Sequence, residues 1–172
     1  MTDLPQIALS VRQPWAWAII YAGKTIENRG PVMLRHLPKP ICRRIAIHAS
    51  KGMTRDEYEV ASDFINGLAG RIVCPSAADL LRGGIVGSVD VVDIVTKSLS
   101  PWFFGPRGMV LRDPKPCEFV PAVGALGYFK WTRGDTSIVP KTARWMTAPV
   151  AAVPAIGTKE PASLPLFDAG DE

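Results

Sequence analysis

The stretch from Ile85 to Val95 restricts the possible fold more than any other part of this chain. It is a run of β-branched residues interrupted by small and polar ones, with Gly87 inside it. Such a run is typical of a β-strand. A strand this long that contains a glycine is expected to bend or to carry a bulge. Strands of this kind are needed where a sheet curls into a small barrel.

The rest of the chain predicts more short strands and only a few helices. The expected strands cover residues 7–11, 24–28, 44–49, 109–111, 118–123 and 128–131. Helices are expected after Pro14, where Gly23 ends the apolar pattern, over residues 54–68, and over residues 77–81. Thr54 and Glu57 have the spacing of a capping box. The fold class is therefore α+β and mainly β, a small β-barrel with helices between its strands.

The composition changes after Trp131. Residues 132–172 hold five prolines and seven alanines, and no apolar period continues for more than a few residues. Such a segment does not contain enough regularly spaced apolar surface to fold by itself. We therefore expect one domain over residues 1–133 and a disordered tail over residues 134–172.

The size and the cysteine content place limits on the class of protein. The chain has 172 residues, enough for a domain whose core needs no disulfide or metal. No run approaches the roughly 18 apolar residues that span a membrane, and the first residues do not resemble a signal peptide. Three widely separated cysteines and only two histidines argue against a disulfide framework and a zinc site. We expect no membrane, no metal or other cofactor, and a cytoplasmic location.

Positive charge is concentrated in one part of the chain. Residues 12–51 carry eight lysines and arginines and a single acid, Glu27, which gives +7 in that segment against +4 for the whole chain. A concentration of this kind can be a solvated basic surface. It can also attract phosphate groups and so favour a nucleic acid or a nucleotide as the ligand.

The single acid lies in the segment Gly23-Lys24-Thr25-Ile26-Glu27-Asn28-Arg29. On a strand, Thr25, Glu27 and Arg29 would share one face, and Lys24 would lie at the turn before them. A carboxylate between two cations stays ionised. Glu27 can therefore orient Lys24 and Arg29 or accept hydrogen bonds from the edge of a base. The alternative is an ion pair that only fixes this loop.

Other residues near the basic segment are further candidates for binding. Trp15 and Trp17 point in different directions on a helix, so that one is expected in the core while Trp15 is available to stack on a base. His48, at the end of a strand, is either a structural residue or part of the cleft wall. The remaining candidates for binding are Arg12, Ser50 and Lys51.

Four motifs in order resemble the ASCH family, a relative of the PUA-like domains. They are Leu9-Ser10-Val11-Arg12-Gln13-Pro14-Trp15-Ala16, Gly23-Lys24-x-x-Glu27-x-Arg29, Ile45-Ala46-Ile47-His48 and Gly83-Gly84-Ile85-Val86-Gly87-Ser88-Val89-Asp90. Residues 124–131 also suit the last strand of that family. The resemblance covers roughly residues 7–131, and it implies a PUA-like barrel with a cleft beside the second motif.

The resemblance also implies a function in which RNA or another nucleic acid binds in the cleft. Some members of the family are similar to enzymes that remove an acetyl group from a modified cytidine, with the motif lysine and a threonine three residues later. Here those positions hold Lys24 and Glu27. A carboxylate does not replace a hydroxyl nucleophile, although Thr25 offers a hydroxyl nearby. The main prediction is therefore binding of RNA or a nucleotide. The alternative is a small hydrolase, a ribonuclease or an amidohydrolase, that uses Lys24 and Glu27 as catalytic residues.

The tail contains one further motif. Ser163-Leu164-Pro165-Leu166-Phe167 resembles the short peptides by which bacterial proteins bind the DNA sliding clamp, with Ser163 in place of the usual glutamine. Leu164, Leu166 and Phe167 would contact the clamp. A third hypothesis is therefore an adaptor protein that is tethered through its tail.

Overall fold

The fold is built around one curved sheet of six strands. The computed structural model describes residues 4–31, 43–69 and 72–147. The strands are β1 (Ile7–Val11), β2 (Ile26–Asn28), β3 (Arg43–Ala49), β4 (Gly84–Val95), β5 (Gly108–Pro121) and β6 (Tyr128–Lys130). The helices are α1 (Trp15–Tyr21) and α3 (Arg55–Ala69), with short 3₁₀ turns η1 (Thr136–Ile138) and η2 (Arg144–Met146). The expected class, α+β and mainly β, is confirmed.

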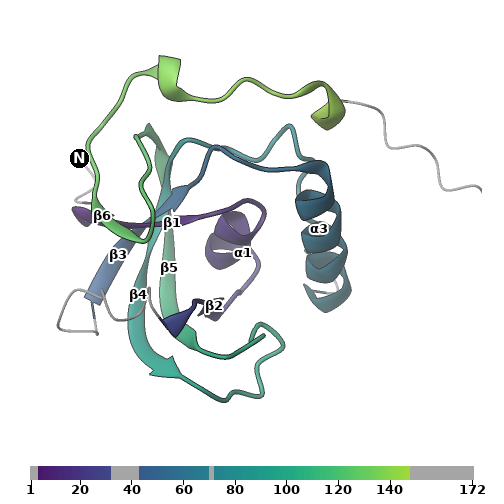
Figure 1. Ribbon diagram of the computed structural model, residues 1–172, viewed down its shortest axis with the longest axis vertical. Helices are drawn as coiled ribbons and strands as arrows, with labels where there is room; N and C mark the ends of the chain where they lie inside the picture. The colour runs from purple at the N-terminus through teal and green to yellow at the C-terminus, as the bar shows by residue number, and fades with distance from the viewer. Residues whose placement is uncertain (1–3, 32–42, 70–71, 148–172) are drawn as a thin grey trace, which may run out of the picture.

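The sheet curls around α1, as Figure 1 shows, while α3 lies on the far side of that helix. The strand order is β2-β5-β4-β3-β1-β6. β1 and β3 are parallel, and the other neighbours are antiparallel. The two end strands, β2 and β6, are not paired with each other. The curved sheet of the described strands is therefore an open half-barrel.

The long strand predicted from residue 85 is β4. It has the irregular pairing that was expected from the glycine inside it. Its pairing with β5 shifts register between Ile85 and Gly87 and at two later places. A Cβ atom on Gly87 would lie 2.6 Å from the carbonyl oxygen of Lys115 and 2.8 Å from Cδ1 of Ile20. Only a glycine therefore lets both α1 and β5 approach β4 so closely.

The main core lies between α1 and the concave face of the sheet. Nearly every residue of α1 is apolar, and four are buried: Ala16, Ala18, Ile19 and Ile20. Ala16, Ile19 and Ile20 pack against side chains of the sheet, which include Leu9, Ile45, Ile47, Val89 and Met109. Ala18 belongs to a second cluster, with Ile65 and Trp102. A short helix that is apolar on all sides is stable only where both faces are covered. The sheet covers one face of α1, and the aromatic side chains near α3 cover another.

Two predictions about the secondary structure are wrong. No helix forms over residues 77–81: residues 77–79 form a single turn. The Ser76 hydroxyl donates to the carboxylate of Asp79 (2.6 Å), and the Asp79 N–H donates to the Ser76 carbonyl (3.0 Å). These local bonds compete with a helical ladder, so the segment forms one turn and stops.

The strands expected over 109–111 and 118–123 are parts of one strand, β5, which runs through Pro114 and Pro116. Prolines normally interrupt a strand in the interior of a sheet because they lack an N–H group. β2 pairs only with residues 108–110 of β5. Beyond that point the other edge of β5 is not paired with β2, and prolines are tolerated at such an edge.

The folded part of the chain extends beyond the predicted boundary at Arg133. Met146 is buried against Met53, Ala77 and Leu80, and the segment that carries it runs across the molecule from β6 toward α3 (Figure 1). Buried Arg82 donates to the carbonyls of Lys51 (2.8 Å) and Lys141 (3.4 Å) and so fixes this segment. Residues 134–147 therefore pack on the domain. The remainder of the predicted disordered tail, residues 148–172, lies outside the described residues.

Within the described ranges, no helix has the length and apolar character needed to cross a membrane.

Candidate functional site

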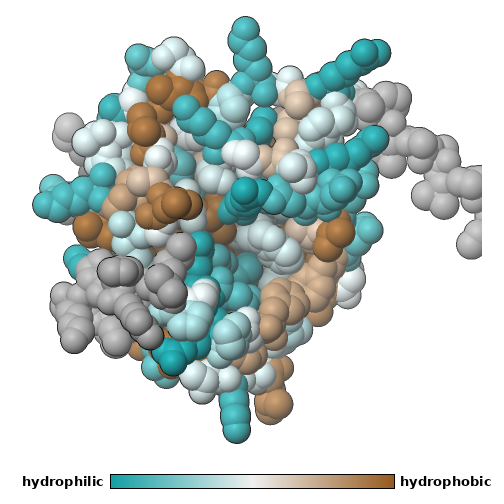
Figure 2. Space-filling view, viewed as in Figure 1, coloured by the Kyte–Doolittle hydropathy of each residue, from teal (hydrophilic) through white to brown (hydrophobic). Residues whose placement is uncertain are grey.

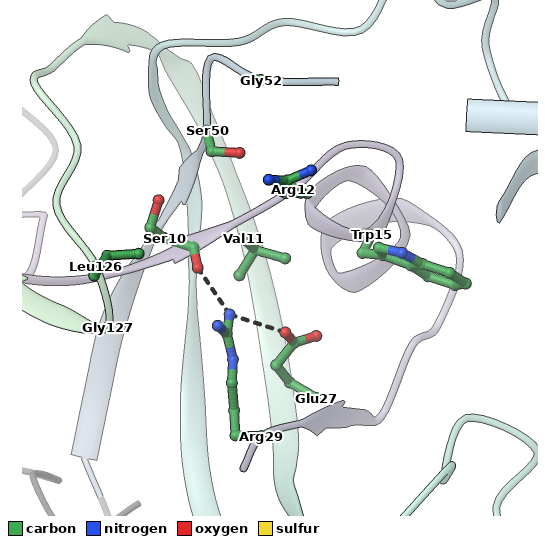
Figure 3. Close-up of a pocket in the computed structure, with 10 residues that line it drawn as sticks. All are labelled: Ser10, Val11, Arg12, Trp15, Glu27, Arg29, Ser50, Gly52, Leu126 and Gly127. Carbon is green, nitrogen blue, oxygen red and sulfur yellow. Dashed lines mark hydrogen bonds and ion pairs between the residues drawn. The ribbon is translucent and has the colours of Figure 1, made fainter. Parts of the chain in front are cut away.

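A cleft of about 430 Å³ opens at the C-terminal ends of β1 and β3, and Figure 3 shows the side chains around it. Because β1 and β3 are parallel, both strands end at this place. The antiparallel pairing of β6 with β1 brings the loop before β6 to the same place, where the Ser10 N–H donates to the Gly127 carbonyl (3.3 Å). The lining residues are Ser10, Val11, Arg12, Trp15, Glu27, Arg29, Ser50, Gly52, Leu126 and Gly127.

Glu27 is the centre of an ion-pair network in the wall of this cleft. Its Oε2 lies 2.7 Å from Nζ of Lys24, and its Oε1 lies 2.9 Å from Nη2 of Arg29. Arg29 Nη2 also donates to the carbonyl of Ser10 (2.7 Å), as the dashed lines in Figure 3 show. The network therefore joins β2 to β1 and fixes the direction of the Glu27 carboxylate.

A left-handed residue makes this network possible. α1 ends at Tyr21, and Gly23 has φ +67°. This conformation favours glycine and turns the chain back toward β2. The Lys24 N–H donates to the Ala18 carbonyl (3.1 Å), which holds the Lys24 backbone at the C-terminal end of α1.

Lys24 lies beneath Glu27 and not on the surface of the cleft. Its side chain is only 2% exposed, and Nζ donates to the Ile26 carbonyl as well as to Glu27. Nζ also lies 5.9 Å from the centre of the Trp15 ring. The sequence placed Lys24 at the turn before the strand and made it a catalytic residue of the hydrolase alternative. The structure instead uses it to hold the carboxylate from behind.

Thr25 is not brought into the cleft. It is exposed, and its hydroxyl lies 3.3 Å from that of Ser100, on a different loop. The predicted alternation of Thr25, Glu27 and Arg29 on one face fails at Thr25 because β2 begins only at Ile26. Glu27 and Arg29 both line the cleft, as that alternation predicted for them.

Arg12 forms the outer rim of the cleft. It makes an ion pair with Glu57 at the start of α3, and its side chain is 58% exposed. Glu57 is held by the expected capping box: it accepts from the Thr54 N–H (2.9 Å), and its own N–H donates to the Thr54 hydroxyl (3.2 Å). The bond from the Thr54 N–H lowers the pKa of Glu57, and the charge of Arg12 adds to this effect.

Trp15 provides an aromatic side wall. Its ring makes edge contacts with Phe64 (5.9 Å between centroids) and Phe104 (6.4 Å). These contacts hold the indole in one orientation beside the cleft (Figure 3). Trp17, the other tryptophan of α1, packs against Tyr21 and does not line this cleft.

His48 lies behind the cleft and is 1% exposed. Its Nε2 is 3.0 Å from the Ala122 carbonyl, and its Nδ1 is 3.2 Å from the Ser10 hydroxyl. A carbonyl can only accept, so Nε2 carries the proton and Nδ1 accepts from Ser10. Gly124 covers the ring so closely that a Cβ there would lie 2.4 Å from Cε1 of His48.

Ser50 and Lys51 follow β3 and both line a depression beside the main cleft, but only Ser50 also lines the main cleft. Ser50 lines the main cleft, and its buried Oγ has no hydrogen-bond partner among the described residues. Lys51 is exposed and lines a neighbouring depression, beside the loop over residues 123–126. Two other bases of the basic segment over residues 12–51, Arg35 and Lys39, lie outside the described residues.

The sequence did not identify the loop at Leu126 and Gly127 as part of the site, nor Ser10 as a lining residue. Both lie within motifs that we had singled out, but only the pairing of β6 with β1 brings them together. Leu126 is almost fully exposed at the rim. Within the described ranges, no group of three or more histidine, cysteine and acidic side chains has a geometry that could hold a metal ion.

Burial of His48 has a testable effect on the stability of the protein. Desolvation lowers its pKa below the ordinary 6.5, so the unfolded chain binds more protons at acid pH. The stability that depends on a neutral His48 is fully present above pH 6.5. It is lost as the pH falls from 6.5 toward the pKa of His48 in the folded protein. We expect the free energy of unfolding, measured by urea denaturation, to fall between pH 7.5 and 5.5. The decrease should be smaller in His48→Gln, and equal decreases in both proteins would contradict this prediction.

No protein-family model matches the chain, and no curated protein matches its sequence significantly.

Proposed function

We propose that this protein binds a nucleotide unit of a single-stranded nucleic acid, with RNA as the preferred ligand, in the cleft beside Glu27. The observation that carries the proposal is the composition of the cleft wall. It combines a fixed aromatic ring (Trp15), an exposed cation (Arg12) and an oriented carboxylate (Glu27) within one cavity. Single-stranded nucleic acids are recognised by stacking, by charge and by hydrogen bonds to base edges, which are the three features that these residues offer.

The size and charge of the cleft agree with such a ligand. Ligand cavities in proteins are typically about 300–1,000 Å³, and this cleft is about 430 Å³. Arg12 is at the rim, where a phosphate would remain partly solvated. Its present partner Glu57 is itself held by the capping box, so that Arg12 can leave it for a phosphate without disturbing the helix.

The order of the four motifs supports the same function. We propose that the chain is a member of the ASCH family. The resemblance to that family implied a nucleic-acid-binding cleft beside Gly23-Lys24-x-x-Glu27-x-Arg29. The half-barrel and a cleft at that place are consistent with this membership. We place the protein in the cytoplasm, since its widely separated cysteines suit a reducing compartment.

Binding without turnover is favoured over the hydrolase alternative. In a hydrolase, Lys24 would have to assist the reacting groups and a hydroxyl would have to attack. Lys24 is engaged by Glu27 and the Ile26 carbonyl beneath the cleft wall, and the Thr25 hydroxyl faces Ser100. The tail hypothesis depends on Leu164, Leu166 and Phe167, which lie outside the described residues.

Fluorescence anisotropy with a labelled single-stranded RNA 12-mer tests the proposal. We expect affinity to decrease with increasing salt, because bound phosphates release counterions. Arg12→Ala should weaken binding and reduce the slope of log affinity against log salt by about one. Lys24 and Arg29 are less suitable targets because both also hold Glu27 in place.

Arg144→Ala is the matched control. Arg144 is exposed on η2, does not line the cleft, and its replacement changes the net charge by the same amount. Binding in this variant should equal that of the unmodified protein. Equal effects of the Arg12 and Arg144 replacements would mean that the RNA binds through general charge and not in the cleft.

A further inference from the structure

The inner wall of the cleft presents hydrogen-bond acceptors and few free donors. Each oxygen of the Glu27 carboxylate accepts from one cation, Oε2 from Lys24 and Oε1 from Arg29. A carboxylate oxygen has two lone-pair positions, so each oxygen keeps one for a ligand. Figure 3 shows the carboxylate at the centre of the cleft, between Arg29 and Trp15.

Ser10 adds another acceptor to this wall. Its hydroxyl proton is donated to Nδ1 of His48, which must accept because its Nε2 donates to the Ala122 carbonyl. The lone pairs of the Ser10 oxygen therefore remain for a ligand. Among the lining side chains, donors lie farther along the wall: the buried Ser50 hydroxyl, which has no partner among the described residues, the indole N–H of Trp15, and Arg12 at the rim.

The charges around the Glu27 carboxylate disfavour a cationic ligand. Lys24 and Arg29 already neutralise Glu27, and Arg12 is paired with Glu57, so these five groups leave one net positive charge. A ligand that fits has neutral N–H groups for the carboxylate and negative charge elsewhere. A nucleotide with an N–H-rich base edge meets both conditions.

We propose that the cleft selects guanine, whose N1–H and 2-amino group donate together to the Glu27 carboxylate. This inference rests on the proposed function and names the base of its ligand. Guanine has two adjacent donors on its Watson–Crick edge. Adenine and cytosine each have one amino donor beside an acceptor, and uracil has one N–H between two carbonyls. With any of these three bases, a ring nitrogen or carbonyl lone pair would face the carboxylate, which is unfavourable.

The test compares single-stranded RNA 9-mers of uridine in which the central base is guanine, hypoxanthine, adenine, cytosine or uracil, with the full chain. A bidentate contact to one base should give the guanine 9-mer at least about tenfold higher affinity than the adenine, cytosine and uracil 9-mers. Hypoxanthine keeps N1–H but lacks the 2-amino group, so its affinity should be intermediate. Because this comparison uses the unmodified protein, it does not depend on the stability of a variant.

A replacement tests the role of the carboxylate itself. Glu27→Gln keeps the shape but replaces one acceptor oxygen by an amide donor. In the folded variant, verified by circular dichroism, the ratio of guanine to adenine affinity should fall toward one. Equal affinity for all five 9-mers would overturn the guanine inference and leave nucleotide binding intact. No affinity for any of them would overturn both. A preference for another base, equal affinity for guanine and hypoxanthine, or an unchanged ratio in Glu27→Gln would overturn the bidentate contact.

Discussion

Replacing Glu27 with alanine is expected to lower the free energy of unfolding by about 3–5 kcal/mol, the typical cost of removing one partner from a buried ion pair. The Lys24 side chain is 2% exposed and that of Glu27 is 9% exposed, so that neither is solvated by bulk water. Without the carboxylate, the Lys24 ammonium keeps the Ile26 carbonyl but loses its counter-charge in the interior. Urea denaturation of the two proteins measures the difference.

The exposed pair between Arg55 and Glu59 provides the control. Both side chains are 57% exposed, and their separation is 3.1 Å. Exposed pairs at this spacing on a helix contribute about 0.3–0.5 kcal/mol. Glu59→Ala should therefore change the stability very little. A similarly small loss in Glu27→Ala would contradict the claim that Glu27 compensates a buried charge.

Gly87→Ala is expected to destabilise the fold by about 1–3 kcal/mol, the usual cost of adding atoms to a well-packed interior. The new Cβ would meet the Lys115 carbonyl on β5 and the Ile20 side chain on α1. Ile20 can move slightly, but the Lys115 oxygen belongs to the backbone of a paired strand. Relief therefore requires β4 and β5 to separate at this point. Thermal or urea denaturation gives the change in stability.

Gly67→Ala is the matched control, and it is expected to have the opposite sign. Gly67 lies in α3, and no atom comes within 4 Å of a Cβ placed there. In an open helical position, alanine stabilises by about 0.5–1 kcal/mol relative to glycine. If both replacements shift the stability in the same direction, close packing at Gly87 is not the cause.

The strand that restricted the fold at the outset was predicted well because its signal is local. The β-branched residues, the length of the run and the position of Gly87 are all present within residues 85–95, and they indicated a bent strand. The Thr54–Glu57 capping box and the turn at Gly23 were predictable for the same reason. The turn at 77–79 and the continuous strand β5 were not. At residues 77–81, local hydrogen bonds between Ser76 and Asp79 competed with the helix that the apolar pattern predicted. In β5, the prolines are tolerated because β2 pairs with only three of its residues, and this depends on neighbours in space.

The candidate site shows the same division. The sequence by itself indicated that Glu27 is the single acid of a basic segment and that it lies near Lys24 and Arg29. The tertiary structure decided that Lys24 supports the carboxylate from behind, that Thr25 points elsewhere, and that Ser10 and residues 126–127 complete the cleft. The physical reason is that a motif specifies which groups are close along the chain. Burial, hydrogen-bond partners and the direction of a side chain depend instead on which strands pair. For the cleft, they are set by the pairing of β1 with β3 and β6 and of β2 with β5.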